Sequence, residues 1–86
     1  MGFQEWDEQP VQATVYPNPN NGIFYVNLKN AEQAMLTVMD ITGQIVYHKQ
    51  VLDNLPIELK GIADGLYLYT ITQNNRQLTG KLLLAH

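Results

Sequence analysis

The sequence predicts an all-β domain, an antiparallel sandwich or barrel of about seven short strands and no helix. Two features support this prediction. Runs rich in β-branched, aromatic and aliphatic residues recur about every ten residues, the spacing of short antiparallel strands. Clusters of Pro, Asn, Asp and Gly separate these runs and supply the chain reversals between them.

The predicted strands follow a polar linker. Residues 1–13 are predicted as this linker because they are polar and contain Pro10, and residues 14–86 as one folded domain. Each predicted strand is a short β-prone run bounded by turn residues: 13–16, 23–29, 35–40, 44–51, 56–59, 66–72 and 77–84.

Alternation along these strands separates an apolar face from a polar one. The predicted core residues are Phe24, Val26, Leu28, Leu36, Val38, Ile57, Leu59, Tyr67, Tyr69, Ile71, Leu78, Leu82 and Leu84. The predicted polar face includes Tyr25, Asn27, Thr37, Gln77 and Thr79. Residues 44–51 fit either orientation, because a slip of one residue exchanges the two faces. One alternation directs Ile45 and Tyr47 inward, and the other directs Val46 and His48 inward.

Composition excludes several classes of function. The net charge is −3, and the five Lys and Arg residues are spread along the chain, so no basic stripe exists to bind a nucleic-acid backbone. The absence of Cys excludes disulfides and thiolate zinc sites. The longest apolar run, 82–85, is too short to span a membrane, and residues 1–10 lack the apolar run of a signal peptide. We expect no nucleic acid, membrane insertion, metal or cofactor.

The stretch 15–28 contains more turn residues than a link between two strands requires. Pro17 and Pro19 fix φ and restrict the residue before each of them, so residues 15–19 are predicted as a stiff segment near the polyproline form. Gly22 can adopt positive φ and reverse the chain into the next strand. Because prolines lack a backbone donor, the first strand is predicted to lie at a sheet edge.

Two further turns have a similar character. In MDITGQIVY, Asp40 can accept hydrogen bonds from the amides that follow, and Gly43 can supply positive φ. This pattern predicts a hairpin between the strands on either side. In GIADGLYLYT, Asp64 and Gly65 turn the chain into an aromatic strand.

The order of these turns resembles a known family. Four motifs follow one another: YPNPNNG (16–22), MDITG (39–43), GLYLYTI (65–71) and GKLLL (80–84). In this order they resemble the type A C-terminal sorting domain of the type IX (Por) secretion system, and the resemblance spans residues 15–84. It implies an Ig-like antiparallel β-sandwich of about seven strands. Residues 14–86 would be the sorting domain, and residues 1–13 the remnant of a cargo junction.

The resemblance also implies a function. The domain would be a non-catalytic C-terminal signal that directs an N-terminally attached cargo through the type IX translocon, by way of the periplasm and outer membrane, to the cell surface or the medium. A sortase-like surface peptidase would remove it by cleavage in the linker before Val15. The implied recognition or scaffold positions are the motif residues Pro17, Asn18, Pro19, Gly22, Asp40, Gly43, Gly65, Tyr67 and Lys81.

The last strand departs from the family pattern. Members often end in several Lys or Arg residues, whereas LLLAH follows Lys81 here, and Gln44 stands where Lys is frequent. We hypothesise that the translocon adds a strand to the exposed edge of the last strand, oriented by Lys81 or the terminal carboxylate. The alternative is that Leu82 and Leu84 belong to the core, so that removal of residues 82–86 unfolds the domain.

Other polar residues could carry chemistry. His48 and His86 lie near no Asp–Ser or Asp–Glu constellation, so no catalytic triad is predicted. Asp40, Asp53 and Asp64 could bind calcium if their loops converged, but no loop has the spacing of a known calcium loop. Capping of turns is therefore the favoured role for these carboxylates.

The tyrosines suggest a second function. Tyr67 and Tyr69 share the predicted core face, so packing is favoured for both. Tyr25 and Tyr47 remain candidates for a sugar-stacking platform. The alternative function is therefore an Ig-like accessory module that binds carbohydrate or a protein partner.

Overall fold

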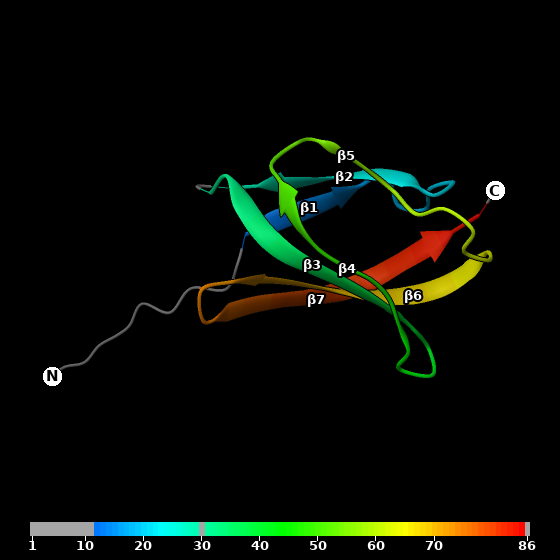
Figure 1. The fold of residues 1–86 in the computed structure, drawn as a ribbon. Helices are drawn as coiled ribbons and strands as arrows, with labels where there is room; N and C mark the ends of the chain where they lie inside the picture. Colours follow the sequence, from blue (N-terminus) through cyan, green and yellow to red (C-terminus); the bar gives the residue numbers. More distant parts are fainter. Residues whose placement is uncertain (1–11, 30, 86) are drawn as a thin grey trace, which may run out of the picture.

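The computed structural model describes residues 12–29 and 31–85. This part of the chain contains seven strands and no helix (Figure 1). The strands are β1 (Ala13–Tyr16), β2 (Ile23–Leu28), β3 (Gln33–Asp40), β4 (Ile45–Leu52), β5 (Pro56–Glu58), β6 (Gly65–Gln73) and β7 (Arg76–Leu84). Every one of them overlaps a predicted strand. Most of the predicted linker, residues 1–13, lies outside the described residues, as does His86.

The strands form two layers (Figure 1). Sheet A has the order β1-β2-β5, and sheet B has the order β4-β3-β6-β7. All pairs of neighbouring strands are antiparallel. The fold is therefore the predicted antiparallel sandwich, and β1 lies at a sheet edge as expected. In the described part of the chain no helix is long and apolar enough to cross a membrane.

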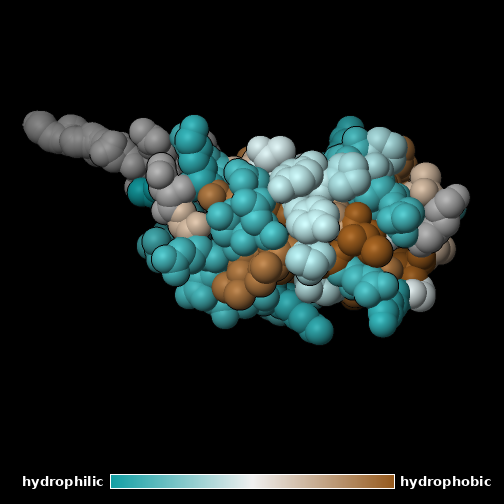
Figure 2. All heavy atoms as spheres, turned by 90° about the horizontal axis from the view of Figure 1, so that it is seen from above, coloured by the Kyte–Doolittle hydropathy of each residue, from teal (hydrophilic) through white to brown (hydrophobic). Residues whose placement is uncertain are grey.

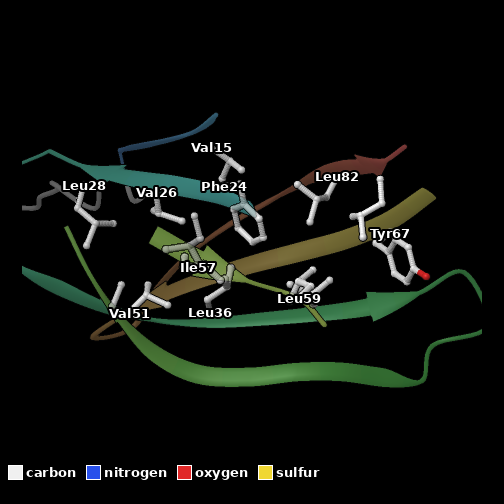
Figure 3. Packing of buried hydrophobic residues seen from close by; sticks show 14 residues of the cluster. Val15, Phe24, Val26, Leu28, Leu36, Val51, Ile57, Leu59, Tyr67 and Leu82 are labelled. Atoms are coloured by element: carbon white, nitrogen blue, oxygen red, sulfur yellow. The ribbon is translucent and has the colours of Figure 1, made fainter. Parts of the chain in front are cut away.

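The core fills the space between the two sheets (Figure 3). Most predicted core residues are buried, and the two exceptions, Tyr69 and Leu78, are half-buried against the core. The core also takes in Val15, Ala34 and Val51, which the sequence prediction left out. All three occupy inward positions of strands, where alternation places them opposite the other sheet.

A β-bulge decides the orientation of β4. Val38 pairs with Tyr47 and the next residue, Met39, pairs with Ile45, so the register shifts between them. The extra residue separates Ile45, which is 55% exposed, from Tyr47, which packs against the core. Neither predicted alternation was right, because both kept Ile45 and Tyr47 on the same face. His48 lies outside, where its Nδ1 is 2.8 Å from the Thr37 hydroxyl.

Candidate recognition site

Residues 17–20, called the crossing segment below, lead from sheet A to the edge of sheet B. The Tyr16–Pro17 and Asn18–Pro19 peptide bonds are both cis. Val15 and Tyr16 belong to β1 and residues 17–19 bend, so the polyproline conformation expected for residues 15–19 is wrong. The segment bends instead, and the bend carries the chain from β1 to the neighbourhood of β7.

The side chain of Asn18 holds the crossing segment against β7. Its Nδ2 donates to the carbonyl of Lys81 at 2.7 Å, and its Oδ1 accepts from the amide of Leu83 at 3.0 Å. The amide side chain thus replaces one N–H and one C=O of a missing neighbouring strand. Two motif residues that lie 63 positions apart in sequence, Asn18 and Lys81, are consequently in contact.

The backbone of Asn20 continues this pairing. Its N–H donates to the carbonyl of Leu83 at 3.0 Å, and its carbonyl accepts from the amide of Ala85 at 2.8 Å. Asn20 and Leu84 form a parallel β-bridge. The crossing segment therefore takes the place of a short neighbouring strand and covers the edge of β7 over residues 81–85.

The turn after the crossing segment is closed by Asn20. The Asn20 side chain is 5% exposed, donates to the Pro17 carbonyl at 3.1 Å and accepts from the Gly22 amide at 2.9 Å. Gly22 has φ of +106°, which confirms the predicted need for glycine. Its carbonyl accepts from the Leu59 amide at 2.7 Å, which joins the turn to the chain after β5.

The β3–β4 hairpin is organised by Asp40, as predicted. Its Oδ1 accepts from the Thr42 hydroxyl at 2.6 Å and from the amides of Thr42 and Gln44 at 2.9 and 3.0 Å. These bonds stabilise the carboxylate, the Thr42 hydroxyl most strongly, and lower the pKa of Asp40 below its usual value. Gly43 has φ of +92°, the conformation that the turn requires of it.

The third motif lies beside β7. Gly65, at the start of β6, has φ of +151° and pairs with Leu84. Tyr67 is buried, pairs with Leu82, and donates its hydroxyl hydrogen to the Ala63 carbonyl at 2.6 Å. On its other side, Tyr67 pairs with Asp40.

These pairings bring all four sequence motifs to one end of the sandwich. The crossing segment lies on β7, β7 on β6, and β6 on the end of β3. We call this the motif end, formed by residues 17–22, 40–43, 63–67 and 80–85. In Figure 1 it is the end that carries the loops β1–β2, β3–β4 and β5–β6 and the tip of the β7 arrow.

The family model of the secretion system C-terminal sorting domain matches residues 14–85. The chain belongs to this family. No curated protein matches it. Membership makes the chain a C-terminal sorting signal of type IX secretion, which implies export to the cell surface or secretion through the outer membrane. Domains of this family are generally non-catalytic, interact with the type IX machinery and follow an N-terminal cargo.

The outer face of sheet B of the sorting domain divides into two parts. Near the motif end, the cross-strand pair Leu66 and Leu83 is exposed, each side chain by 42%. Toward the opposite end, Thr70 pairs with Thr37 and with Thr79. Exposed apolar side chains of this sheet therefore lie beside the motifs, and also at the opposite end, where Leu52 of β4 is 47% exposed.

The outer face of sheet A is mainly hydrophilic. Figure 2 views the sandwich from this side and shows hydrophilic atoms over much of the face, with hydrophobic patches between them in both halves. Ile23, at the start of β2 beside the motif end, is 43% exposed. Tyr25 stacks on Tyr16 on this face, with ring centroids 5.6 Å apart, and the Tyr16 hydroxyl donates to Asn54 Oδ1 at 2.8 Å.

The structure does not bring the two candidate platform tyrosines together. The Tyr25 side chain lies on the outer face of sheet A, whereas Tyr47 packs against the core. Burial raises the pKa of Tyr47. Lys49 Nζ lies 5.8 Å from the centroid of the Tyr47 ring. Tyr67 is buried and Tyr69 half-buried, which confirms the packing predicted for both.

The carboxylates do not converge in the described chain, where no three His, Cys, Asp or Glu side chains form a metal-binding group. Asp40 caps its own turn. Asp53 was predicted to cap its own turn, and this prediction is wrong. Its Oδ1 accepts from the Leu28 amide at 2.7 Å and thereby joins the β4–β5 loop to the end of β2. Sequence separation of 25 residues hid this contact, because capping was considered only within each turn.

Sequence reasoning missed the role of Gly80. Gly80 pairs with Tyr69 across β6 and β7. A Cβ atom at Gly80 would lie 2.5 Å from Cζ of Tyr69, so the ring covers the glycine directly. Burial of this ring raises the pKa of Tyr69. A glycine inside a strand was the available signal, since it often marks close approach of another group.

Proposed function

We propose that the sorting domain acts without catalysis to direct an N-terminally attached cargo protein through the type IX translocon. The motif end is the surface that we assign to this role. The observation that carries the proposal is the convergence of the four motifs, which are separate in sequence and adjacent in the fold. A signal assembled this way is read only when the domain has folded.

The position of the cargo agrees with this role. The chain enters the sandwich at β1, where the Gln12 carbonyl accepts from the Lys29 amide at 2.9 Å. From Ala13, β1 runs toward Pro17 and the motif end. A cargo joined before β1 therefore enters at the opposite end of β1 and leaves the motif end accessible.

We further propose that a sortase-like surface peptidase removes the domain after export by cleavage before Val15. Val15 is 9% exposed and paired with Val26, so the bond is expected nearer the N-terminus. Cleavage there would release the domain without cutting through its core. Mass spectrometry of the mature cargo identifies the cut, and a cut inside β2–β7 contradicts this proposal.

The export proposal is tested with a periplasm-directed reporter that carries residues 1–86 at its C-terminus. In a type IX-competent bacterium, we expect the reporter at the cell surface or in the medium. The matched control is the same fusion in a strain that lacks the translocon, where it should remain periplasmic. Periplasmic retention in both strains would contradict the proposal and favour the accessory-module alternative.

A further inference from the structure

The N-terminal half of β7 keeps an open edge. The β6–β7 register is continuous along β7, so outward-pointing backbone groups occur at every second residue. Lys81 and Leu83 use such groups to bond the crossing segment. By the same alternation, the N–H and C=O groups of Gln77 and Thr79 point away from β6. No described residue is bonded to these outward groups.

A shallow hollow lies beside this open half. Leu78 of β7 lines it together with residues at the start of β1 and the end of β2: Gln12, Ala13, Thr14, Asn27 and Lys29. β1 is also an edge strand, with no further described strand beyond it. Because the crossing segment closes this side of the sandwich at the motif end, the open backbone is confined to residues 77–79.

The surroundings of the open half are cationic. Arg76 and Lys81 flank it on β7, both with exposed side chains, and Lys29 lines the hollow. These are three of the five cationic side chains of the chain. The ion pair within the described residues joins Lys60 to Glu58 instead, so none of the three is neutralised by a described carboxylate.

We propose that the open half of β7, residues 77–79, receives an extended acidic segment of the secretion machinery by β-strand addition. The inference rests on the proposed export function and names the contact through which recognition occurs. The open N–H and C=O groups supply backbone hydrogen bonds, and the three cations select a negatively charged segment. The part of β7 already covered by the crossing segment takes no added strand.

The pattern along β7 also defines the side chains of the segment. Gln77 and Thr79 lie on the exposed outer face, so the residues of the added segment that pair with them are polar or charged. Leu78 is half-buried on the inner face and borders the hollow, so the residue of the added segment that pairs with it is apolar. The segment therefore alternates acidic and apolar residues.

The test is Thr79→Pro in the reporter fusion, with Thr79→Val as the matched control. Proline removes the outward N–H of Thr79 and obstructs an added strand, but it removes no bond to β6. Valine retains the N–H and the β-branched shape. We expect surface reporter to fall about tenfold with Thr79→Pro, the effect of losing about 1.4 kcal/mol of binding, and to stay at the wild-type level with Thr79→Val.

Charge reversal gives a second arm that does not depend on proline. Arg76→Glu should also lower surface reporter, whereas Lys60→Glu, which changes the net charge equally but lies away from the edge, should leave it unchanged. Thermal unfolding of each purified variant shows whether it folds. If Thr79→Pro does not fold, the comparison of Arg76→Glu with Lys60→Glu tests the proposal instead, and equal surface reporter for these two variants would contradict it.

The outcomes separate the two proposals. Failure of the unmodified fusion to leave the periplasm overturns the export function itself. Normal export of both folded variants, Thr79→Pro and Arg76→Glu, overturns only strand addition at the open half. Light scattering of the 86-residue chain completes the test: a monomer is expected, and a dimer that Thr79→Pro dissociates would identify a second copy as the occupant and overturn the assignment to the machinery.

Discussion

The two halves of β7 differ in nearly every respect although they form one continuous strand. The C-terminal half has Leu82 and Leu84 at 0% and 1% exposure and an edge covered by the crossing segment. The N-terminal half has Leu78 half-buried, Thr79 exposed and an open edge. The part nearest the C-terminus is thus mainly structural, and the part nearest the β6–β7 turn is accessible to a partner.

This contrast corrects the hypothesis that the whole edge of the last strand is open. The hypothesis is wrong for residues 81–85, which the crossing segment covers, whereas no described residue bonds the outward backbone groups of residues 77–79. It also settles the alternative drawn from Leu82 and Leu84, which are core residues. Loss of export after removal of residues 82–86 would therefore report unfolding and would not locate a recognition sequence.

The largest expected effect comes from the structural half. Leu82→Ala should lower the free energy of unfolding by about 2–5 kcal/mol, because it leaves a cavity at a fully buried position. Urea denaturation measures the loss. The matched control is the neighbouring Leu83→Ala, which should cost well under half as much because Leu83 is 42% exposed. Equal losses at the two positions would contradict the contrast between buried and exposed faces.

Gly80 lies where the two halves meet and gives the next effect. Gly80→Ala should lower the free energy of unfolding by about 1–2 kcal/mol. The new methyl group must displace the Tyr69 ring, and this costs more stability than is gained by removing the flexibility of glycine from the unfolded chain. In a Tyr69→Val background the same change should cost nothing or stabilise slightly. Denaturation of the four proteins forms a double-mutant cycle, and an equal cost in both backgrounds would show that the ring is not responsible.

Removing one contact of the crossing segment tests the difference between the edges directly. Asn18→Ala should lower stability by about 1 kcal/mol, since both lost hydrogen bonds are exposed. Amide hydrogen exchange at Leu83 should accelerate, while exchange at Ala85, bonded to Asn20, should change less. Asn18→Asp is the control, because it retains the acceptor for Leu83. Unchanged exchange at Leu83 in Asn18→Ala would contradict the role of the side chain.

The smallest effect is expected in the β3–β4 turn, which also belongs to the motif end but lies outside β7. Since the pKa of Asp40 is lowered in the folded state, its ionised form contributes stability at pH values above the usual Asp value of 3.8. That contribution should disappear as the pH falls from there through the lowered pKa. NMR titration measures the pKa directly. Asp40→Asn should weaken the acid dependence of stability, and an Asp40 pKa at or above 3.8 would contradict this account.

The local features of the fold were predictable from the sequence. Strand positions followed from β-prone runs bounded by turn residues, and the turns at Gly22 and Asp40 followed from short-range side-chain chemistry. These properties depend on neighbours a few residues apart. The bulge between Ile45 and Tyr47 was not predictable, because two alternations of β4 had similar apolar content.

The candidate site was not predictable from the sequence, because its contacts are long-range. Nothing in the sequence around Asn18 indicates that its amide bonds Lys81 and Leu83. The pairing depends on how the crossing segment bends and on β7 lying at an edge, and both are properties of the assembled sheets. The family resemblance identified motif positions, but it did not show that they share one end of the molecule.

The bonds between residues 18–20 and 81–85 tie the beginning of the domain to its close. During synthesis, the backbone N–H and C=O of Asn20 therefore lack their partners on β7 until Leu83 and Ala85 have emerged from the ribosome. A nascent chain that stops inside β7 cannot form these bonds, so the edge of β7 is covered only after residues 81–85 have been synthesised.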